Sequence, residues 1–254
     1  MKLSERIHAL VDLSERYLQE SVSLTEPVTM PRGGEIAMWI DSTLLRADAT
    51  VEDVRQLCVD ARHYNFVNVC VNPAYVQLAA GLLNDSPVGV VGLVGFPLGA
   101  SLATYKAFET LANLEAGASE IDMVLNIGAL RSQAYAQVLD EIQMVVTIAH
   151  NRRAPLKVII ETALLTKHEK VMACLLGKEA GADFIKTSTT FAGGGATLED
   201  VSLIRSVVGR EMGVKASGGI RSYKDALAMI QAGANRIGTS AGVTIVEQAQ
   251  ETSA

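Results

Sequence analysis

Short apolar runs alternate with helical patterns along most of this chain, and this alternation limits the possible fold more than any other feature. The runs begin at residue 36, and each is followed by roughly ten to twenty residues with helical spacing. The expected strands cover residues 37–41, 66–71, 88–94, 120–125, 156–160, 184–187, 214–217 and 236–238. Strands that alternate with helices form parallel βαβ units, and eight such units close into a barrel. We therefore predict an α/β protein with the (β/α)8 TIM barrel fold.

A short repeat sets the register of alternate strands. Gly117, Gly181 and Gly233 each stand between two alanines just before a strand, and Asn65 has the same place before the second strand. Glycine or asparagine is expected there because the end of a helix often needs a left-handed backbone. Counting five residues on gives the residues expected in one interior layer of the barrel: Cys70, Asp122, Lys186 and Gly238. A cysteine, a carboxylate and a lysine do not make a hydrocarbon layer, so this layer points to a chemical site.

The first 34 residues stand apart from this alternation. Residues 4–19 have apolar positions at helical spacing, and a polar stretch with Pro27, Pro31, Gly33 and Gly34 follows. We predict an N-terminal helix and linker over residues 1–34 and one catalytic barrel domain over residues 35–254, since closed α/β barrels of about 250 residues form single domains. The extra helix is expected to cover the base of the barrel or to join a subunit interface.

Charge and cysteine content limit the partners and the compartment. The net charge is -6 and no dense block of lysine and arginine occurs, so we expect no nucleic-acid or membrane partner. The N-terminal residues lack the apolar core of a signal peptide, and the longest apolar run, residues 88–96, is too short to span a bilayer. Cys58, Cys70 and Cys174 are widely spaced, which is typical of reduced thiols in a cytoplasmic protein.

Three lysines are expected at neighbouring strand ends. Lys186 closes the sixth strand, and Lys157 and Lys215 lie on the fifth and seventh. Crowded ammonium groups in a partly dehydrated cavity disfavour one another's charge, so the most buried amine should lose its proton most easily. A neutral lysine amine is the nucleophile that forms a Schiff base with a carbonyl compound. The simpler alternative is a lysine whose stem lies on apolar surface while its ammonium reaches water or a carboxylate.

Asp122 has two possible roles beside these lysines. It can balance the remaining ammonium charge and relay a proton during Schiff-base chemistry. Alternatively, it forms a structural ion pair with Lys157 or Lys215, and both roles can hold at once.

Two glycine-containing segments predict an anion site. Residues 217–221 (SGGIR) follow the seventh strand, and residues 238–242 (GTSAG) follow the eighth and open the last helix. Phosphate often binds at these two loops of a TIM barrel because backbone N–H groups at a helix start face it. The alternative is two ordinary turns. A third segment, Gly193 to Gly195, fits a flexible loop as well as a ligand cradle.

Other reaction classes lack their signals. The four histidines are not at strand ends, so no metal ligands are evident: His8, His63, His150 and His168. No GxGxxG segment follows a strand, which disfavours a dinucleotide-dependent reaction. Cys70 is expected to line the substrate pocket rather than to act as a nucleophile.

Seven motifs in this order resemble those of the deoxyribose-phosphate aldolase family, over about residues 36 to 246. They are IDSTLL (40–45), VCVNP (69–73), VGFPLG (94–99), EIDMV (120–124), KVIIET (157–162), FIKTST (184–189) and VKASGGIR (214–221). The resemblance implies a class I aldolase, a lyase that reversibly cleaves 2-deoxy-D-ribose 5-phosphate to acetaldehyde and D-glyceraldehyde 3-phosphate in deoxyribonucleotide catabolism. It also implies small aldehyde and sugar-phosphate substrates, no metal or organic cofactor, and a homo-oligomer, either a dimer or a tetramer.

The same resemblance implies roles for individual residues. Lys186 forms the Schiff base, Lys215 favours the neutral form of that amine, and Asp122 shares in proton transfer with Lys215. The implied substrate-binding residues are Asp41, Cys70, Lys157 and Thr187. The implied phosphate-binding residues are Gly218, Gly219, Gly238 and Ser240.

Two positions depart from the family pattern. Ser42 stands where many members have histidine, and Thr190 stands where many have glycine, so Thr190 is expected to narrow or stiffen the phosphate-side loop. Three other functions remain open: another Schiff-base aldolase or transaldolase, a sugar-phosphate isomerase or epimerase using Asp41 and Asp122, and a non-catalytic phosphosugar-binding barrel.

Overall fold

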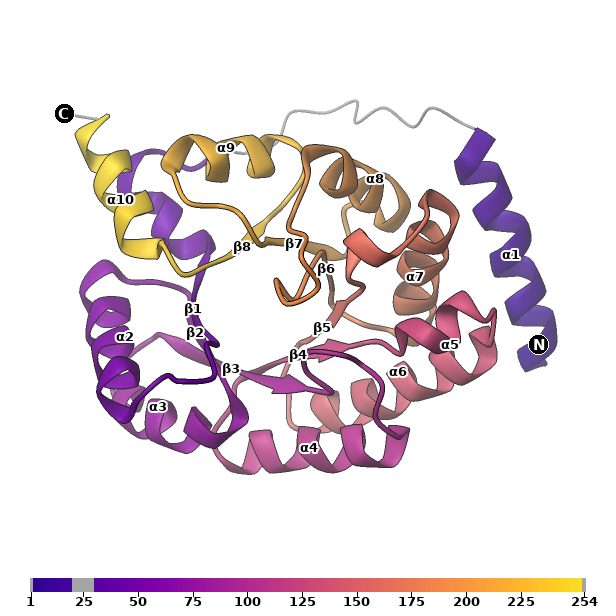
Figure 1. Cartoon of the computed structure of the whole chain (residues 1–254), viewed down its shortest axis with the longest axis horizontal. Coiled ribbons are helices and arrows are strands. Elements are labelled where there is room, and N and C mark those ends of the chain that lie inside the picture. The colour runs from indigo at the N-terminus through magenta and orange to yellow at the C-terminus, as the bar shows by residue number, and fades with distance from the viewer. Residues whose placement is uncertain (1, 20–29, 253–254) are drawn as a thin grey trace.

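Eight parallel strands form a closed barrel in the computed structural model, which describes residues 2–19 and 30–252. The strands follow one another around the barrel in chain order (Figure 1). They are β1 (Ile40–Leu44), β2 (Asn68–Val71), β3 (Gly89–Val94), β4 (Glu120–Val124), β5 (Leu156–Ile159), β6 (Phe184–Lys186), β7 (Gly213–Ser217) and β8 (Arg236–Thr239). The predicted TIM barrel is confirmed.

Helices surround the barrel and bury the outward faces of its strands. They are α1 (Leu3–Gln19), α2 (Val51–Tyr64), α3 (Val76–Leu83), α4 (Ala103–Glu115), α5 (Ile127–Arg131), α6 (Tyr135–Asn151), α7 (Lys167–Ala180), α8 (Leu198–Val208), α9 (Tyr223–Gln231) and α10 (Gly242–Glu251). Apolar side chains such as Ile121, Val158 and Val214 are fully buried in the main core cluster. No helix in the described ranges is long and apolar enough to cross a membrane.

The helix ends have the conformations that the repeat predicts. Asn65 has φ 58°, and the glycines at positions 117, 181 and 233 have φ 101°, 86° and 116°. A left-handed residue ends the helix and turns the chain into the next strand. This turn fixes which side chains of β2, β4, β6 and β8 face the interior.

The first strand begins later than predicted. The apolar residues Ile36 and Ala37 belong to a 3₁₀ helix (Gly33–Trp39), and β1 starts at Ile40. This helix is closed at its start by Glu35, whose carboxylate accepts a hydrogen bond from the backbone N–H of Arg32 at 2.9 Å. Ile36 and Ala37 are both buried, but the prediction that residues 37–39 belong to the first strand is wrong.

The N-terminal helix lies outside the ring of helices, alongside α7 (Figure 1). Arg6 of α1 forms an ion pair with Glu179 of α7 at 2.6 Å, and Ser14 lies 3.1 Å from His168. The expectation that this helix covers the base of the barrel is therefore wrong. Most of the expected linker, residues 20–29, lies outside the described residues.

Candidate active site

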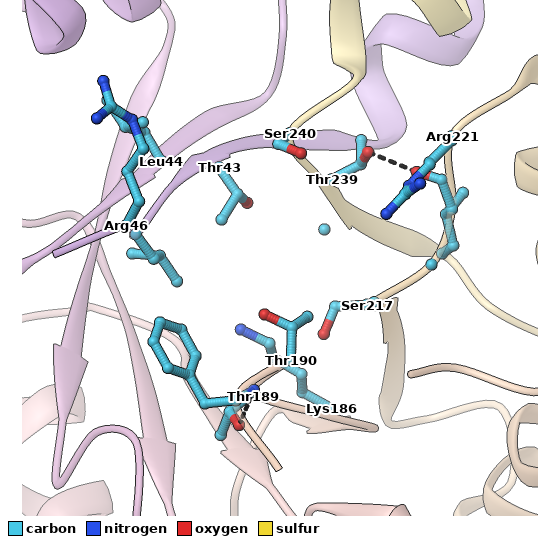
Figure 2. A pocket seen from close by; sticks show the side chains of 16 residues that line it. Thr43, Leu44, Arg46, Lys186, Thr189, Thr190, Ser217, Arg221, Thr239 and Ser240 are labelled. Carbon is cyan, nitrogen blue, oxygen red and sulfur yellow. Dashed lines mark hydrogen bonds between the residues drawn. The ribbon is translucent and has the colours of Figure 1, made fainter. Parts of the chain in front are cut away.

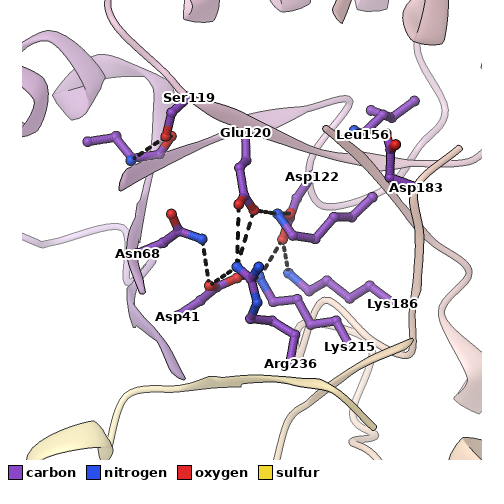
Figure 3. A network of polar contacts seen from close by, with 12 residues as sticks. Asp41, Asn68, Ser119, Glu120, Asp122, Leu156, Asp183, Lys186, Lys215 and Arg236 are labelled. Atoms are coloured by element: carbon purple, nitrogen blue, oxygen red, sulfur yellow. Dashed lines mark hydrogen bonds and ion pairs between the residues drawn. The ribbon is translucent and has the colours of Figure 1, made fainter. Parts of the chain in front are cut away.

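Asp122 lies at the centre of a buried charge network inside the barrel (Figure 3). Its Oδ1 accepts a hydrogen bond from Lys157 at 2.9 Å. Its Oδ2 accepts one from Lys186 at 2.8 Å and one from Lys215 at 2.9 Å. The three lysines on β5, β6 and β7 thus meet at one carboxylate, as their strand positions predict.

Two further carboxylates complete the network. Asp41 on β1 accepts hydrogen bonds from Lys215, from Arg236 at 2.9 Å and from the Asn68 amide at 2.9 Å. Glu120 forms ion pairs with Lys157 and, at 3.3 Å, with Arg236. Four cationic side chains (157, 186, 215 and 236) therefore face three carboxylates (41, 120 and 122). With every group ionised, the network carries one excess positive charge.

Strand register explains why these side chains meet. Asp122 lies beside Lys157 in the β4–β5 pairing, and Lys186 lies beside Lys215 in the β6–β7 pairing. Side chains two residues apart on a strand point to the same face. Glu120 therefore faces the interior with Asp122, and Arg236 does so with Gly238. Glu120 and Arg236 were not predicted as site residues, although their two-residue spacing from Asp122 and Gly238 indicates an inward position.

Neighbouring opposite charges outweigh burial in setting the pKa values of Asp122 and Lys215. Burial alone would raise the pKa of Asp122, but the ammonium groups of Lys157, Lys186 and Lys215 hold it well below its usual value. Burial alone would lower the pKa of Lys215, but Asp122 and Asp41 raise it. Lys215 is therefore a cation at neutral pH. The expectation that the most buried amine loses its proton most easily is wrong for this residue, because Asp122 and Asp41 favour its charged form more than burial disfavours it.

Cys70 lies in the same interior without a charge of its own. It packs with Val91 and Leu93 in a small apolar cluster inside the barrel. Burial raises the pKa of its thiol to about 11. Cys70 is therefore protonated at neutral pH, as expected of a packing residue rather than a nucleophile.

A pocket of about 430 Å³ opens above this network at the carboxyl ends of the strands. Lys186 is part of its lining, and Figure 2 shows this side chain across the pocket from Arg221, Thr239 and Ser240. Four predicted phosphate-binding residues also line it: Gly218, Gly219, Gly238 and Ser240. The remaining predicted site residues are buried and are not among the lining residues: Asp41, Cys70, Asp122, Lys157, Thr187 and Lys215.

Glycine is needed at several positions in and beside the pocket, for different structural reasons. Gly218 and Gly219 have φ 96° and 81°, a backbone region that side chains rarely adopt. A Cβ at Gly195 would lie 2.6 Å from the carbonyl oxygen of Gly218, so this part of the Gly193–Gly195 loop must pack closely on the segment after β7. A Cβ at Gly238 would lie 3.0 Å from Cε of Lys215, so glycine here leaves room for that lysine.

Thr190, the departure noted in the sequence, has an unusual backbone. Its φ is 77°, in the left-handed region that disfavours a β-branched residue. Thr190 lines the pocket between Thr189 and Phe191. Its Cγ2 atom lies 3.1 Å from where a Cβ on Gly218 would stand, so its side chain approaches the segment after β7. The expectation that Thr190 narrows or stiffens the phosphate-side loop stays a prediction.

Metal ligation has no visible basis in the described ranges. Within residues 2–19 and 30–252, no group of three or more His, Cys, Asp and Glu side chains is arranged to hold a metal ion. The carboxylates of the interior instead have lysine and arginine partners.

Known proteins share this arrangement of strands. The family model for DeoC/LacD family aldolases matches residues 36–248 of this chain. The deoxyribose-phosphate aldolase of Thermococcus kodakarensis is 58% identical over 219 residues, which are 85% of this chain and 98% of that protein. A solved structure from Coccidioides immitis has TM-score 0.88 and 39% identity, with 97% of each chain covered. The tetrameric deoxyribose phosphate aldolase of Aeropyrum pernix has TM-score 0.79 and 34% identity over 94% of this chain and 95% of that one. These matches confirm the family resemblance: the chain belongs to the DeoC/LacD family of aldolases, which are lyases.

Proposed function

We propose that this chain reversibly cleaves 2-deoxy-D-ribose 5-phosphate to acetaldehyde and D-glyceraldehyde 3-phosphate through a Schiff base on Lys186. One observation carries the proposal. Lys186 belongs to the buried charge network and also lines the pocket, together with the loops after β7 and β8. An amine, its charge partners and a candidate phosphate site are thus within one substrate's reach.

The charge balance of the network supports a reactive amine at this position. The four cations exceed the three carboxylates by one, and Lys215 is held as a cation. Loss of one proton from Lys186 brings the network to neutrality. Of the three network lysines, Lys186 is the one in the pocket lining, so its free amine would meet the substrate.

The chemistry then follows from the neighbours of Lys186. Its amine attacks the C1 carbonyl, and the carbinolamine loses water to give an iminium ion. The C2–C3 bond breaks, its electron pair forms an enamine, and the C3 hydroxyl gives up its proton as glyceraldehyde 3-phosphate leaves. Protonation of the enamine at C2 and hydrolysis release acetaldehyde and return the amine. Lys215 and Asp122 are proposed to move these protons, because Asp122 accepts hydrogen bonds from both Lys186 and Lys215.

Phosphate binding is assigned to the glycine-containing loops. Gly218, Gly219, Gly238 and Ser240 line the side of the pocket that also holds Arg221. Their backbone N–H groups and the guanidinium suit a phosphate dianion. Asp41 and Lys157 are proposed to act on the substrate through Lys215 and Asp122, to which they are hydrogen-bonded. Thr187 is hydrogen-bonded to Ser217 of the pocket lining, and Cys70 is buried beside Val91 and Leu93, so both are proposed to support the pocket from below.

Borohydride trapping tests the proposal. In the presence of acetaldehyde and borohydride, the protein should gain the mass of one ethyl group on Lys186, and peptide mass analysis locates it. Lys186→Arg keeps a cation but cannot form a Schiff base, so it should abolish both trapping and cleavage. Trapping of dihydroxyacetone but never of acetaldehyde would instead identify another Schiff-base aldolase. Isomerisation of a sugar phosphate that persists in Lys186→Arg would instead identify an isomerase or epimerase that uses Asp41 and Asp122.

We propose a homo-oligomer in the cytoplasm, with residues 35–254 as the catalytic unit. The related Aeropyrum pernix protein is tetrameric. Here α4 exposes Tyr105 and Phe108 in line with Leu102, an uncharged face suited to a second copy of an anionic chain. Light scattering tests this oligomer, because Phe108→Lys should shift the measured molecular mass toward that of a monomer. The buried, unpaired cysteines suit a reducing compartment.

A further inference from the structure

Glu161 has a conformation and a degree of burial that are unusual for glutamate. It follows β5 with φ 53° and ψ 68°, in the left-handed region, and its exposed fraction is 1%. Non-glycine residues seldom adopt this region, and when they do the surrounding contacts usually hold them there. The motif that contains Glu161 was noted in the sequence, but neither the charge network nor the pocket lining includes this residue.

The carboxylate of Glu161 crosses from β5 to the segment after β6. Its Oε2 accepts a hydrogen bond from the backbone N–H of Thr189 at 3.0 Å and another from the Thr189 hydroxyl. Its Oε1 is buried and has no hydrogen-bond partner within the described part of the chain. A buried and half-satisfied carboxylate opposes folding, so its presence calls for a purpose other than stability.

Thr189 connects Glu161 to the wall of the pocket. The Thr189 hydroxyl oxygen accepts a hydrogen bond from the backbone N–H of Phe191 at 3.1 Å. Thr190, which lies between them, has the left-handed φ of 77°. All three residues line the pocket that contains Lys186. The ring of Phe191 meets Phe96 edge to face, with ring centroids 5.2 Å apart, so the wall is also held from the segment after β3.

We propose that Glu161 is a positioning residue that holds the Thr189–Phe191 wall of the pocket in its left-handed turn. This role rests on the proposed function, because it assigns the wall to sugar-phosphate binding. Without the carboxylate, the Thr189 amide and hydroxyl lose their shared acceptor, and Thr190 loses what opposes the strain of its φ. The wall then relaxes away from the segment after β7, which Thr190 approaches, and the phosphate-side pocket loses its shape.

Two variants separate the effect of losing the hydrogen-bond acceptor from the effect of backbone strain. Glu161→Gly removes the carboxylate but suits a positive φ, so backbone strain does not confound the result. Glu161→Gln retains a carbonyl oxygen that can accept from Thr189, and it serves as the matched control. Glu161→Gly should raise KM for 2-deoxyribose 5-phosphate by at least about tenfold, since hydrogen bonds to a charged group are lost. Glu161→Gln should stay within about threefold of the parent.

Acetaldehyde gives the second readout. It is small and has no phosphate, so borohydride trapping of acetaldehyde on Lys186 should proceed at the parent rate in Glu161→Gly. A residue with only a structural role would lower thermal stability without separating the two substrates. Loss of trapping in step with the loss of cleavage, or an unchanged KM, would overturn the positioning role.

Amide hydrogen exchange tests the anchor independently of activity. Peptides covering residues 188–196 should exchange faster in Glu161→Gly, while peptides of β1 and β2 should keep the parent rate. If Glu161→Gly fails to fold, Thr189→Val removes the hydroxyl that donates to Glu161 and accepts from Phe191, and it should give the same exchange pattern. Unchanged exchange in a folded variant would refute the anchor. Failure of the parent to be trapped with acetaldehyde would refute the proposed function alone, because the exchange result does not depend on it.

Discussion

Replacing Lys215 with methionine tests whether this cation keeps Lys186 reactive. Both lysine nitrogens contact Oδ2 of Asp122, at 2.9 and 2.8 Å, so they lie no more than about 5.7 Å apart. Two positive charges at that distance repel by about 3 kcal/mol at an effective dielectric constant of about 20. Removal of Lys215 should therefore favour the protonated Lys186 amine about a hundred-fold. The charge count agrees, because the network without Lys215 is neutral when Lys186 is protonated.

The assay is the rate of borohydride trapping with acetaldehyde as a function of pH. In Lys215→Met the rate at neutral pH should fall about a hundred-fold relative to the parent, and this deficit should shrink as the pH rises. Lys106→Met is the matched control, because Lys106 is equally buried and ion-paired but lies outside the network. It should keep the pH profile of the parent. Circular dichroism at each pH verifies that both variants are folded.

A rate that is lower in Lys215→Met by the same factor at every pH would refute this reasoning. That outcome would mean that Lys215 acts in proton transfer without any effect on the charge state of Lys186.

Four further predictions concern stability and reactivity. Lys106→Met should lower the free energy of unfolding in urea by about 3–5 kcal/mol, because it leaves the buried carboxylate of Glu141 without its cation. Adding Glu141→Leu should recover most of the loss. Thr190→Gly should raise the free energy of unfolding by about 1 kcal/mol through relief of its left-handed φ; an unchanged value would argue against strain there. Cys70, with its pKa raised to about 11, should not react with a thiol reagent near pH 8 until the protein unfolds. Because the pKa of Asp122 is lowered in the folded state, its ionised form stabilises the fold at pH values above the unfolded pKa of about 3.9. This contribution is lost as the pH falls toward the folded pKa, so Asp122→Asn should flatten the acid side of the stability curve measured by urea titration.

The barrel and its lysine layer could be predicted because local rules determined both. The glycine that ends α7 fixes the turn into β6, and strand alternation then turns Lys186 inward. The same two-residue rule applies to Glu120 and Arg236, but these are the first residues of β4 and β8 and so lie away from the carboxyl ends, where a site is expected. Charge states were harder to predict, since the raised pKa of Lys215 depends on Asp122 and Asp41, two residues far away in the sequence.

The contact of Glu161 and the 3₁₀ helix before β1 could not be predicted. Glu161 lies past β5, where side chains no longer alternate, and nothing in a glutamate signals a positive φ. Its partner Thr189 is 28 residues away, and their contact depends on how the segments after β5 and β6 fold over the barrel. The 3₁₀ helix before β1 was missed for a similar reason, because buried apolar residues suit either a strand or a tight helical turn.

The burial of the seven-charge network inside the barrel also decides how it responds to dissolved ions. Counter-ions screen charges only where they can approach them, over about 8 Å at physiological ionic strength. Asp41, Asp122, Lys157 and Lys215 are completely enclosed by protein. Added salt therefore weakens attraction at the pocket mouth, where Arg221 lies, and leaves the electrostatic bias on the reacting amine as the strand register sets it.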